Sequence, residues 1–403
     1  MSGFSTAKPP LVCHMMSPHY GADIIERAKI ANSDQPSPAL CDYVVLDIPH
    51  APDGTYDRAA YSFLKHRGNL SKFMLTVDIN NVVLVSPKDI NTPLLTLSAL
   101  EIRRTVQLYG FGFYGDVEWL NASSYSPNIV RNNARYLQFF YEGFTEVITA
   151  LGVHESEVAN FFAFRPFNLA SRTPSYQGLL EGLNSIPSVE LRFVILLTIT
   201  SERALVVQPS SSWDWLCTVS ANEPTIKDAV ELIATIRQPA FTFIMAVSLR
   251  WDLFSGLKIT RVATRKLNVI LGTAHRVFRY EEECSSVFRR SSGRGGVLYA
   301  GDGGCAFAKV GISDLATFET RGTLEYKMTH AYQYLNQLTK GSHRMGWLAY
   351  NATGGVAPQD FEEIFVRDTD SGTTTYIDKQ YDDCPAGYYD LCEGYQCWDT
   401  YKR

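Results

Sequence analysis

Residues 129–151 carry the most regular apolar pattern in this chain. Apolar side chains recur at helical spacing along one side of the segment, and Gly152 follows as a stop signal. The apolar positions on this side are Ile129, Tyr136, Phe140, Phe144, Val147 and Leu151. A helix with such a face has to bury it against other elements, so the segment predicts a packed helical body.

Further helices are predicted from capping residues and periodic apolar positions. Ser98 and Glu101 form a capping box for one helix, which Gly110 would end. The other predicted helices cover 225–237, 241–249 and 323–339, the second of them buried. The continuous apolar run 189–200 has no period, so it fits either a buried helix or a strand.

The β structure predicted from the sequence is small. Residues 43–48 form one short strand. Residues 73–77 and 82–85 flank Asn80-Asn81, which predicts a β-hairpin near 73–86. Together these elements predict an α+β fold dominated by helices.

The predicted fold has three parts. Residues 1–40 are rich in Pro, Ser and Met and are expected to form an extended N-terminal arm. Residues 41–357 form the helix-rich body with its β-hairpin. Residues 358–403 are acidic, contain Tyr and Cys, and are expected to form an irregular C-terminal tail.

Composition excludes several classes of protein. The chain of 403 residues is 45% hydrophobic and 20% charged, as in ordinary folded proteins. Its net charge of -5 argues against a freely diffusing nucleic-acid binder. The longest apolar run, 193–199, is too short to span a membrane, and no secretory signal is visible. The aromatic share of 12% fits either a large core or an assembly interface.

The cysteine pattern predicts reduced thiols and no metal site. Five cysteines are isolated along the chain, and three in the tail are spaced too widely for zinc: Cys13, Cys41, Cys217, Cys284, Cys305, Cys384, Cys392 and Cys397. The chain is therefore expected to work in a cytosolic environment without a cofactor.

Cations cluster between Arg250 and Arg294. Arg261 and Arg265 are four residues apart, so a helix would place both on one face. The cluster predicts RNA-facing contacts to phosphates, with a solvated face or salt bridges between subunits as the alternative. The candidate RNA-facing residues are Arg261, Arg265, Lys266, Arg276, Arg279, Arg289, Arg290 and Arg294.

The run Gly301-Asp302-Gly303-Gly304-Cys305-Ala306-Phe307 resembles the nucleophile motif of ovarian-tumour-type cysteine peptidases. The resemblance implies Cys305 as nucleophile with Asp302 nearby. Gly304 and Ala306 depart from the family pattern, and a Gly-rich turn before a buried Cys is the other interpretation. Walker, dinucleotide-binding, zinc-protease and kinase motifs are absent from the sequence, so no catalytic residue is nominated and an enzyme is not expected.

The overall profile resembles the coat proteins of small double-stranded RNA viruses of the partitivirus kind. The resemblance implies a capsid protein that assembles in many identical copies around an RNA genome, in the virion and the host cytoplasm, without a membrane. The arm has no net charge, which argues against condensation of flexible single-stranded RNA. The alternatives are a nucleoprotein that coats RNA as a filament and a cysteine peptidase that uses Cys305.

Overall fold

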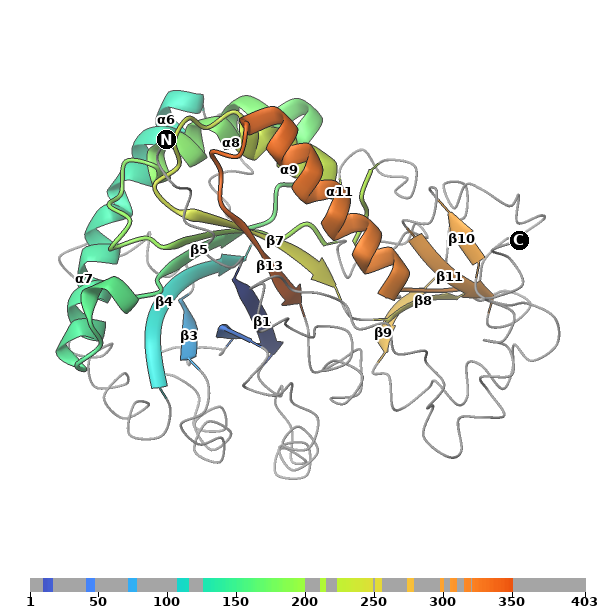
Figure 1. Cartoon of the computed structure of the whole chain (residues 1–403), viewed down its shortest axis with the longest axis horizontal. Helices are drawn as coiled ribbons and strands as arrows, with labels where there is room; N and C mark the ends of the chain where they lie inside the picture. The colour runs from blue at the N-terminus through green and yellow to red at the C-terminus, as the bar shows by residue number, and fades with distance from the viewer. Residues whose placement is uncertain are drawn as a thin grey trace.

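The structure of the chain is a computed structural model (Figure 1). The structure describes residues 10–16, 41–47, 72–77, 107–115, 126–199, 211–214, 223–248, 251–255, 274–278, 298–300, 305–309, 315–319 and 321–350.

Eight strands close into a barrel in the order β1-β13-β7-β6-β5-β4-β3-β2. Their bounds are β1 (Leu11–Met16), β2 (Tyr43–Asp47), β3 (Lys72–Val77), β4 (Gln107–Gly115), β5 (Phe161–Phe164), β6 (Phe193–Leu196), β7 (Thr242–Ser248) and β13 (Met345–Tyr350). All neighbouring pairs are parallel. A closed barrel of eight parallel strands with helices between them is the (β/α)₈, or TIM, architecture.

Helices pack on the outside of the barrel (Figure 1). Their bounds are α6 (Pro127–Tyr136), α7 (Gln138–Ala150), the 3₁₀ turn η2 (Glu155–Glu157), α8 (Leu169–Leu183), α9 (Ile226–Ala234) and α11 (Arg321–Thr339). Local sequence sets where they begin. The Thr225 hydroxyl accepts a hydrogen bond from the Asp228 N–H at 3.0 Å and caps α9, and Pro127 is the first residue of α6.

Aromatic rings fill the layer between the barrel wall and α7. Phe113 of β4 lies 5.8 Å from Phe140 and 5.6 Å from Phe144, measured between ring centroids. The Tyr141 hydroxyl donates to the Phe161 carbonyl oxygen at 2.7 Å, so its polar end is satisfied inside the core. The largest fully buried side chains of the described part are all aromatic. Much of the unusual aromatic content therefore lies in the core.

The barrel interior is a second, separate apolar cluster. It contains Val12, Tyr43, Val45, Met74, Ala159, Phe161, Ala163, Phe193, Ile195, Leu197, Ile199, Ile244, Ala246, Leu348 and Tyr350. Gly112 of β4 shows how tightly it packs, because a Cβ there would lie 2.4 Å from the Phe161 ring. Only glycine leaves room for that ring.

A second sheet of five antiparallel strands has the order β10-β11-β12-β8-β9. Its strands are β8 (Trp251–Ser255), β9 (Ala274–Phe278), β10 (Leu298–Ala300), β11 (Cys305–Lys309) and β12 (Leu315–Phe318). Because β7 ends at Ser248 and β8 begins at Trp251, this sheet is inserted at the carboxyl end of β7. Figure 1 shows it beside the barrel, with α11 leading back towards β13.

The predicted helix-dominated fold class is therefore wrong. The segment 241–249, expected as a buried helix, contains β7, whose residues are all buried. Parallel strands buried on both sides are continuously apolar, so they show no alternation. The β-hairpin near 73–86 is also wrong, because β3 pairs in parallel with β2 and β4, one on each side. Residues 82–85 lie outside the described ranges.

Other sequence expectations need correction at single positions. The predicted helix 129–151 is two helices that meet at Leu137, and Tyr136 is exposed. The helix predicted up to Gly110 is instead strand β4 from residue 107 onward. Residues 11–16 of the expected N-terminal arm form a barrel strand. The domain boundaries at 40 and 357 stay predictions, and the tail 358–403 lies outside the described residues.

Cys13 and Cys41 form a disulfide with a Cα–Cα distance of 5.8 Å. Cys305 is disulfide-bonded as well. The expectation of reduced thiols is wrong for these three residues.

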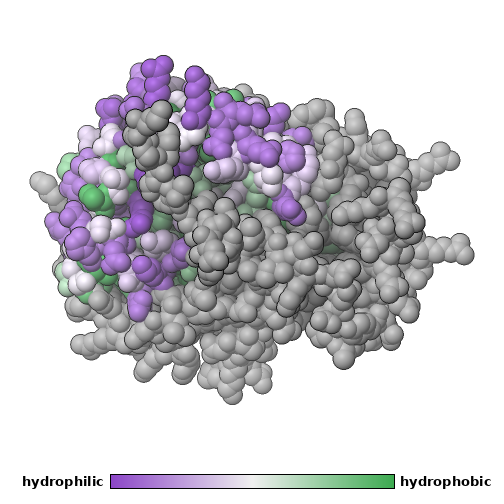
Figure 2. Space-filling view, in the orientation of Figure 1, coloured by the Kyte–Doolittle hydropathy of each residue, from purple (hydrophilic) through white to green (hydrophobic). Residues whose placement is uncertain are grey.

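On the face shown in Figure 2, the described residues over the helices are mostly hydrophilic, with small apolar patches. Over the part of the chain that the structure describes, no helix has the length and apolar character needed to cross a membrane.

Candidate functional site

Functional sites of parallel barrels lie at the carboxyl ends of the strands, where the strand-to-helix connections meet. Side chains alternate between the two sides of each strand, which identifies those that face the interior near this end. They include His14 of β1, Thr76 of β3, Tyr114 of β4, Ser248 of β7 and Tyr350 of β13. This set is polar and aromatic, unlike the apolar cluster below it.

His14, Tyr114 and Tyr350 form a three-ring stack. The His14 ring lies 5.0 Å from Tyr114 with an interplanar angle of 7°, and 4.5 Å from Tyr350 with an angle of 5°. His14 is completely buried between the two tyrosines, whereas Tyr114 is half-buried. Three strands far apart in the sequence thus supply one continuous aromatic stack.

None of these five side chains at the carboxyl end carries a carboxylate. Asp47 is the last residue of β2, and Asp116 and Glu118 follow β4 in the sequence. Within the described ranges, no three His, Cys, Asp or Glu side chains come close enough to hold a metal ion.

Buried polar contacts join the connections around this end. Arg165, which follows β5, forms an ion pair with Glu223, and their side chains are 15% and 8% exposed. The Thr198 hydroxyl donates to the Ala246 carbonyl oxygen at 2.6 Å, which links the end of β6 to β7. The end of the barrel is therefore held by polar contacts as well as by apolar packing.

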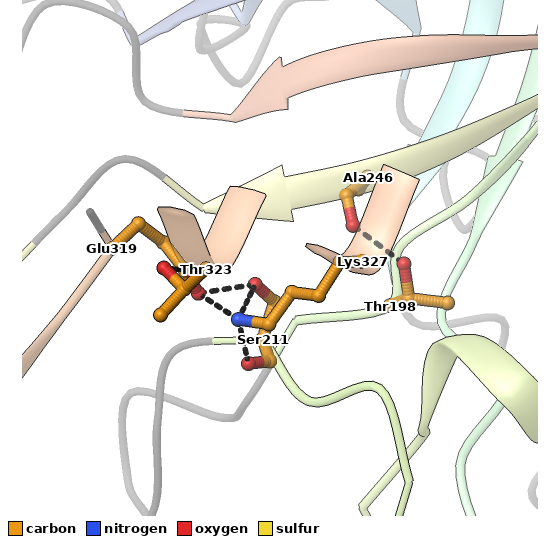
Figure 3. Close-up of polar contacts among 6 residues, drawn as sticks. All are labelled: Thr198, Ser211, Ala246, Glu319, Thr323 and Lys327. Atoms are coloured by element: carbon orange, nitrogen blue, oxygen red, sulfur yellow. Dashed lines mark hydrogen bonds and ion pairs between the residues drawn. The ribbon is translucent and has the colours of Figure 1, made fainter. Parts of the chain in front are cut away.

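A buried lysine, Lys327, forms the centre of a polar cluster (Figure 3). The Lys327 Nζ lies 2.5 Å from Glu319 Oε1 and donates to the Ser211 carbonyl oxygen at 2.8 Å. Thr323 donates to the second Glu319 oxygen at 2.8 Å. Burial lowers the pKa of Lys327, although the charge and hydrogen bond of Glu319 act in the opposite direction.

Of the eight predicted RNA-facing residues, one lies in the part of the chain that the structure describes. Arg276 lies in β9, where its backbone pairs with Leu253 of β8. The other seven (Arg261, Arg265, Lys266, Arg279, Arg289, Arg290 and Arg294) lie outside the described residues. Their phosphate-facing role, and the many-copy assembly, stay predictions.

None of the residues of the aromatic stack was predicted from the sequence. A single His or Tyr in a short apolar segment carries no local signal of function. Only the parallel register, which places the ends of β1, β4 and β13 at one mouth, could have identified them.

The fold is shared with family 18 glycoside hydrolases and related proteins. An N-acetylglucosaminidase of this family from Paenibacillus barengoltzii has a TM-score of 0.55 and 9% identity, covering 85% of this chain and 96% of that one. A mutant class V chitinase from Nicotiana tobaccum in complex with NAG4 has a TM-score of 0.55 and 10% identity, covering 86% and 95%. A chitinase-like agglutinin from Robinia pseudoacacia has a TM-score of 0.53 and 11% identity, covering 87% and 97%.

No family model matches this chain, and no curated protein sequence matches it. At these identities the likeness shows the fold, a chitinase-like TIM barrel.

These findings correct the function expected from the sequence. The partitivirus-like capsid protein, and with it a viral coat packaging RNA, is contradicted by a barrel shared with glycoside hydrolases. The filament-forming nucleoprotein is contradicted on the same ground. The cysteine peptidase is contradicted too, because Cys305 is buried in β11 and disulfide-bonded, so it has no free thiol. The expectation that the chain is not an enzyme is also contradicted, since its fold matches that of glycoside hydrolases.

Proposed function

We propose that this protein binds a chitin-type glycan, a chain of N-acetylglucosamine units, at the carboxyl end of its barrel. The observation that carries the proposal is the stack of Tyr114, His14 and Tyr350 at that end. The half-buried Tyr114 is the member of the stack that a ligand meets first.

The chemistry of the stack suits a sugar ring. A pyranose ring has an apolar face of C–H groups and a polar edge of hydroxyls, so it packs on a flat aromatic face and hydrogen-bonds at its rim. The half-buried Tyr114 offers such a face, and the buried Thr76 and Ser248 are hydroxyl side chains at the same end of the barrel. His14 holds the two tyrosine rings nearly parallel, which pre-organises the surface.

The structural neighbours support the choice of ligand. The Nicotiana chitinase is in complex with NAG4, and the Paenibacillus protein is an N-acetylglucosaminidase. The Robinia protein is an agglutinin. The fold therefore occurs in a protein named as an agglutinin as well as in hydrolases, and we propose binding of the glycan before its hydrolysis.

The disulfides support work in an oxidising compartment. A Cys13–Cys41 bond persists outside the cell or in a secretory compartment and is rare in the cytosol. Chitin-type glycans are extracellular polymers, so the compartment and the ligand agree. The virion and host cytoplasm, expected from the sequence, stay untested predictions.

Calorimetry with the N-acetylglucosamine tetramer tests the proposal, with a glucose tetramer as the control ligand. Wild-type protein should bind the first and not the second. Tyr114→Ala should weaken binding about tenfold, because one stacking face is lost. Tyr136→Ala is the matched control, since Tyr136 is 62% exposed on α6 and takes no part in the stack. No binding of the tetramer by wild-type protein would refute the proposal.

Hydrolysis of the bound glycan is a second candidate, favoured by the barrel shared with chitinases. Glycosidases use Asp or Glu side chains, and family 18 enzymes add assistance from the substrate. Asp116 and Glu118 follow β4 in the sequence, which makes them the carboxylates to replace. Release of shorter oligomers by wild-type protein, lost in Asp116→Asn or Glu118→Gln, would establish hydrolysis. Binding without any release would leave a binding protein.

A further inference from the structure

Three consecutive strand-to-helix connections meet at the carboxyl end of the barrel, and each contributes to a buried ion pair. They run from β5 to α8, from β6 to α9 and, through the inserted sheet, from β7 to α11. Arg165 follows β5 and pairs with Glu223, which precedes α9. Glu319 follows β12 of the inserted sheet and pairs with Lys327 of α11, with side chains 2% and 0% exposed.

Ser211 brings the second pair into contact with the β6–α9 connection (Figure 3). Its carbonyl oxygen accepts from Lys327 Nζ at 2.8 Å, and its hydroxyl donates to Glu319 Oε1 at 2.7 Å. The Ile226 N–H donates to the Ser212 carbonyl oxygen at 2.8 Å, so this segment is anchored to the start of α9. The inserted sheet, α11 and the β6–α9 connection therefore meet at one buried point.

The arrangement is better suited to fixing geometry than to adding stability. Burying two charges costs desolvation free energy that offsets much of their attraction, so such a pair contributes little net stability. Burial lowers the pKa of Lys327, which reflects that cost. The ammonium nevertheless has three oxygen partners, the third being the Ser211 hydroxyl at 3.5 Å. A fully satisfied buried network is compatible with only one arrangement of its elements.

We propose that Lys327 and Glu319 are positioning residues that hold the inserted sheet against the β6–α9 connection in the arrangement that binds the glycan. The affinity part of this inference rests on the proposed function. The geometric part concerns the free protein and can be tested without a ligand.

Three variants separate positioning from packing. Lys327→Met alone leaves the Glu319 carboxylate buried without its charge partner and should lower Tm by about 5–10 °C. The double variant Glu319→Leu with Lys327→Met removes both charges and should recover most of that Tm. Positioning predicts that the double variant still binds the N-acetylglucosamine tetramer about tenfold more weakly than wild type. Amide hydrogen exchange at residues 211–214 of the free protein should also become faster.

The control is another ion pair on the same scaffold. Arg131 and Glu181 pair between α6 and α8, with side chains 34% and 48% exposed. Arg131→Met with Glu181→Leu should leave both the affinity and the exchange at 211–214 unchanged.

The inference is overturned if amide exchange at residues 211–214 is as slow in the Glu319/Lys327 double variant as in wild type. It is also overturned if exchange becomes faster but the double variant binds the N-acetylglucosamine tetramer with wild-type affinity. If wild-type protein binds no glycan, the proposed function fails by itself. The exchange measurement then still decides the geometric part, because unchanged rates refute it and faster rates support it.

Discussion

The two ends of the barrel both carry aromatic side chains, but they are covered differently. At the amino end, Tyr43 and Phe193 are buried, with ring centroids 5.2 Å apart. Two cations lie over the Tyr43 ring, with Lys72 Nζ 5.9 Å and Arg192 Cζ 5.7 Å from its centroid, and Lys72 Nζ is also 4.7 Å from the Tyr109 centroid. Burial raises the pKa of Tyr43, although both cations act in the opposite direction. At the carboxyl end the aromatic rings stack on a histidine instead.

The connections at the two ends differ as well. At the amino end, α9 ends at Ala234 and β7 begins at Thr242, and α11 ends at Thr339 before β13 begins at Met345. At the carboxyl end, the β6–α9 connection spans 197–225 and the β7–α11 connection spans 249–320. Long connections are tolerated where they do not carry the core, and they are where function is built. Under the proposed function, the comparison assigns stability to the amino end and ligand binding to the carboxyl end.

Replacing Phe193 by Ala should give the largest loss of stability, and the change in packing should be confined to the amino end of the barrel. Loss of this buried ring should cost about 3–5 kcal/mol of unfolding free energy. Urea unfolding measures the loss, and Phe139→Ala is the control because Phe139 is 56% exposed on α7. The folded variant should bind the glycan as wild type does. A large loss of affinity in Phe193→Ala would contradict the division between the two ends.

Removing the Cys13–Cys41 disulfide should have the next largest effect. The bond joins residues 28 apart in the sequence, so opening it should cost about 3.5 kcal/mol through the entropy of the unfolded chain. Unfolding of the Cys13→Ser/Cys41→Ser variant measures this cost, and added reductant serves as a control for wild type. A cost below about 1 kcal/mol would mean that strain in the folded barrel offsets the entropic gain.

Lys72→Met tests how much the cations contribute to the stability of the amino end of the barrel. Lys72 also lies 3.6 Å from Glu157, but its side chain is 38% exposed, so solvent weakens both contacts. We expect a loss of about 0.5–1 kcal/mol in thermal or urea unfolding and no change in affinity. An unchanged stability would show that the aromatic packing alone closes this end.

Tyr114→Phe should have the smallest effect and sharpens the role of the carboxyl end. The substitution keeps the ring that stacks on His14 and removes only the hydroxyl. If the ring face carries recognition, affinity for the N-acetylglucosamine tetramer should stay within about threefold of wild type. A loss as large as that of Tyr114→Ala would assign recognition to the hydroxyl instead.

Several local elements could be predicted from the sequence. The helix expected over 323–339 is α11, and the one expected over 225–237 contains α9, which begins after the capping Thr225. The strand expected over 43–48 is β2, and the segment 73–77 lies in β3. Each of these signals depends on residues within a few positions of one another, so no tertiary information was needed.

The strands of the barrel wall were harder to identify. The run 189–200, left open between helix and strand, contains β6, and 241–249 contains β7. Both strands are buried on the interior side and on the helix side, so their sequences show no period of 2. Because that period is missing, the sequence predicted a helix-dominated fold.

The sequence by itself determined where α9 begins and where α11 ends, and which segments are apolar enough to be buried. Only the tertiary structure decided that the strands close into a parallel barrel, because Leu11 of β1 pairs with Trp347 of β13 from the far end of the described chain. The candidate site also depends on barrel closure, because His14, Tyr114 and Tyr350 come together only when β1 joins the barrel wall between β13 and β2. Local signals extend over a few residues, whereas parallel pairing joins segments of any separation, and so the fold and the site depended on closure.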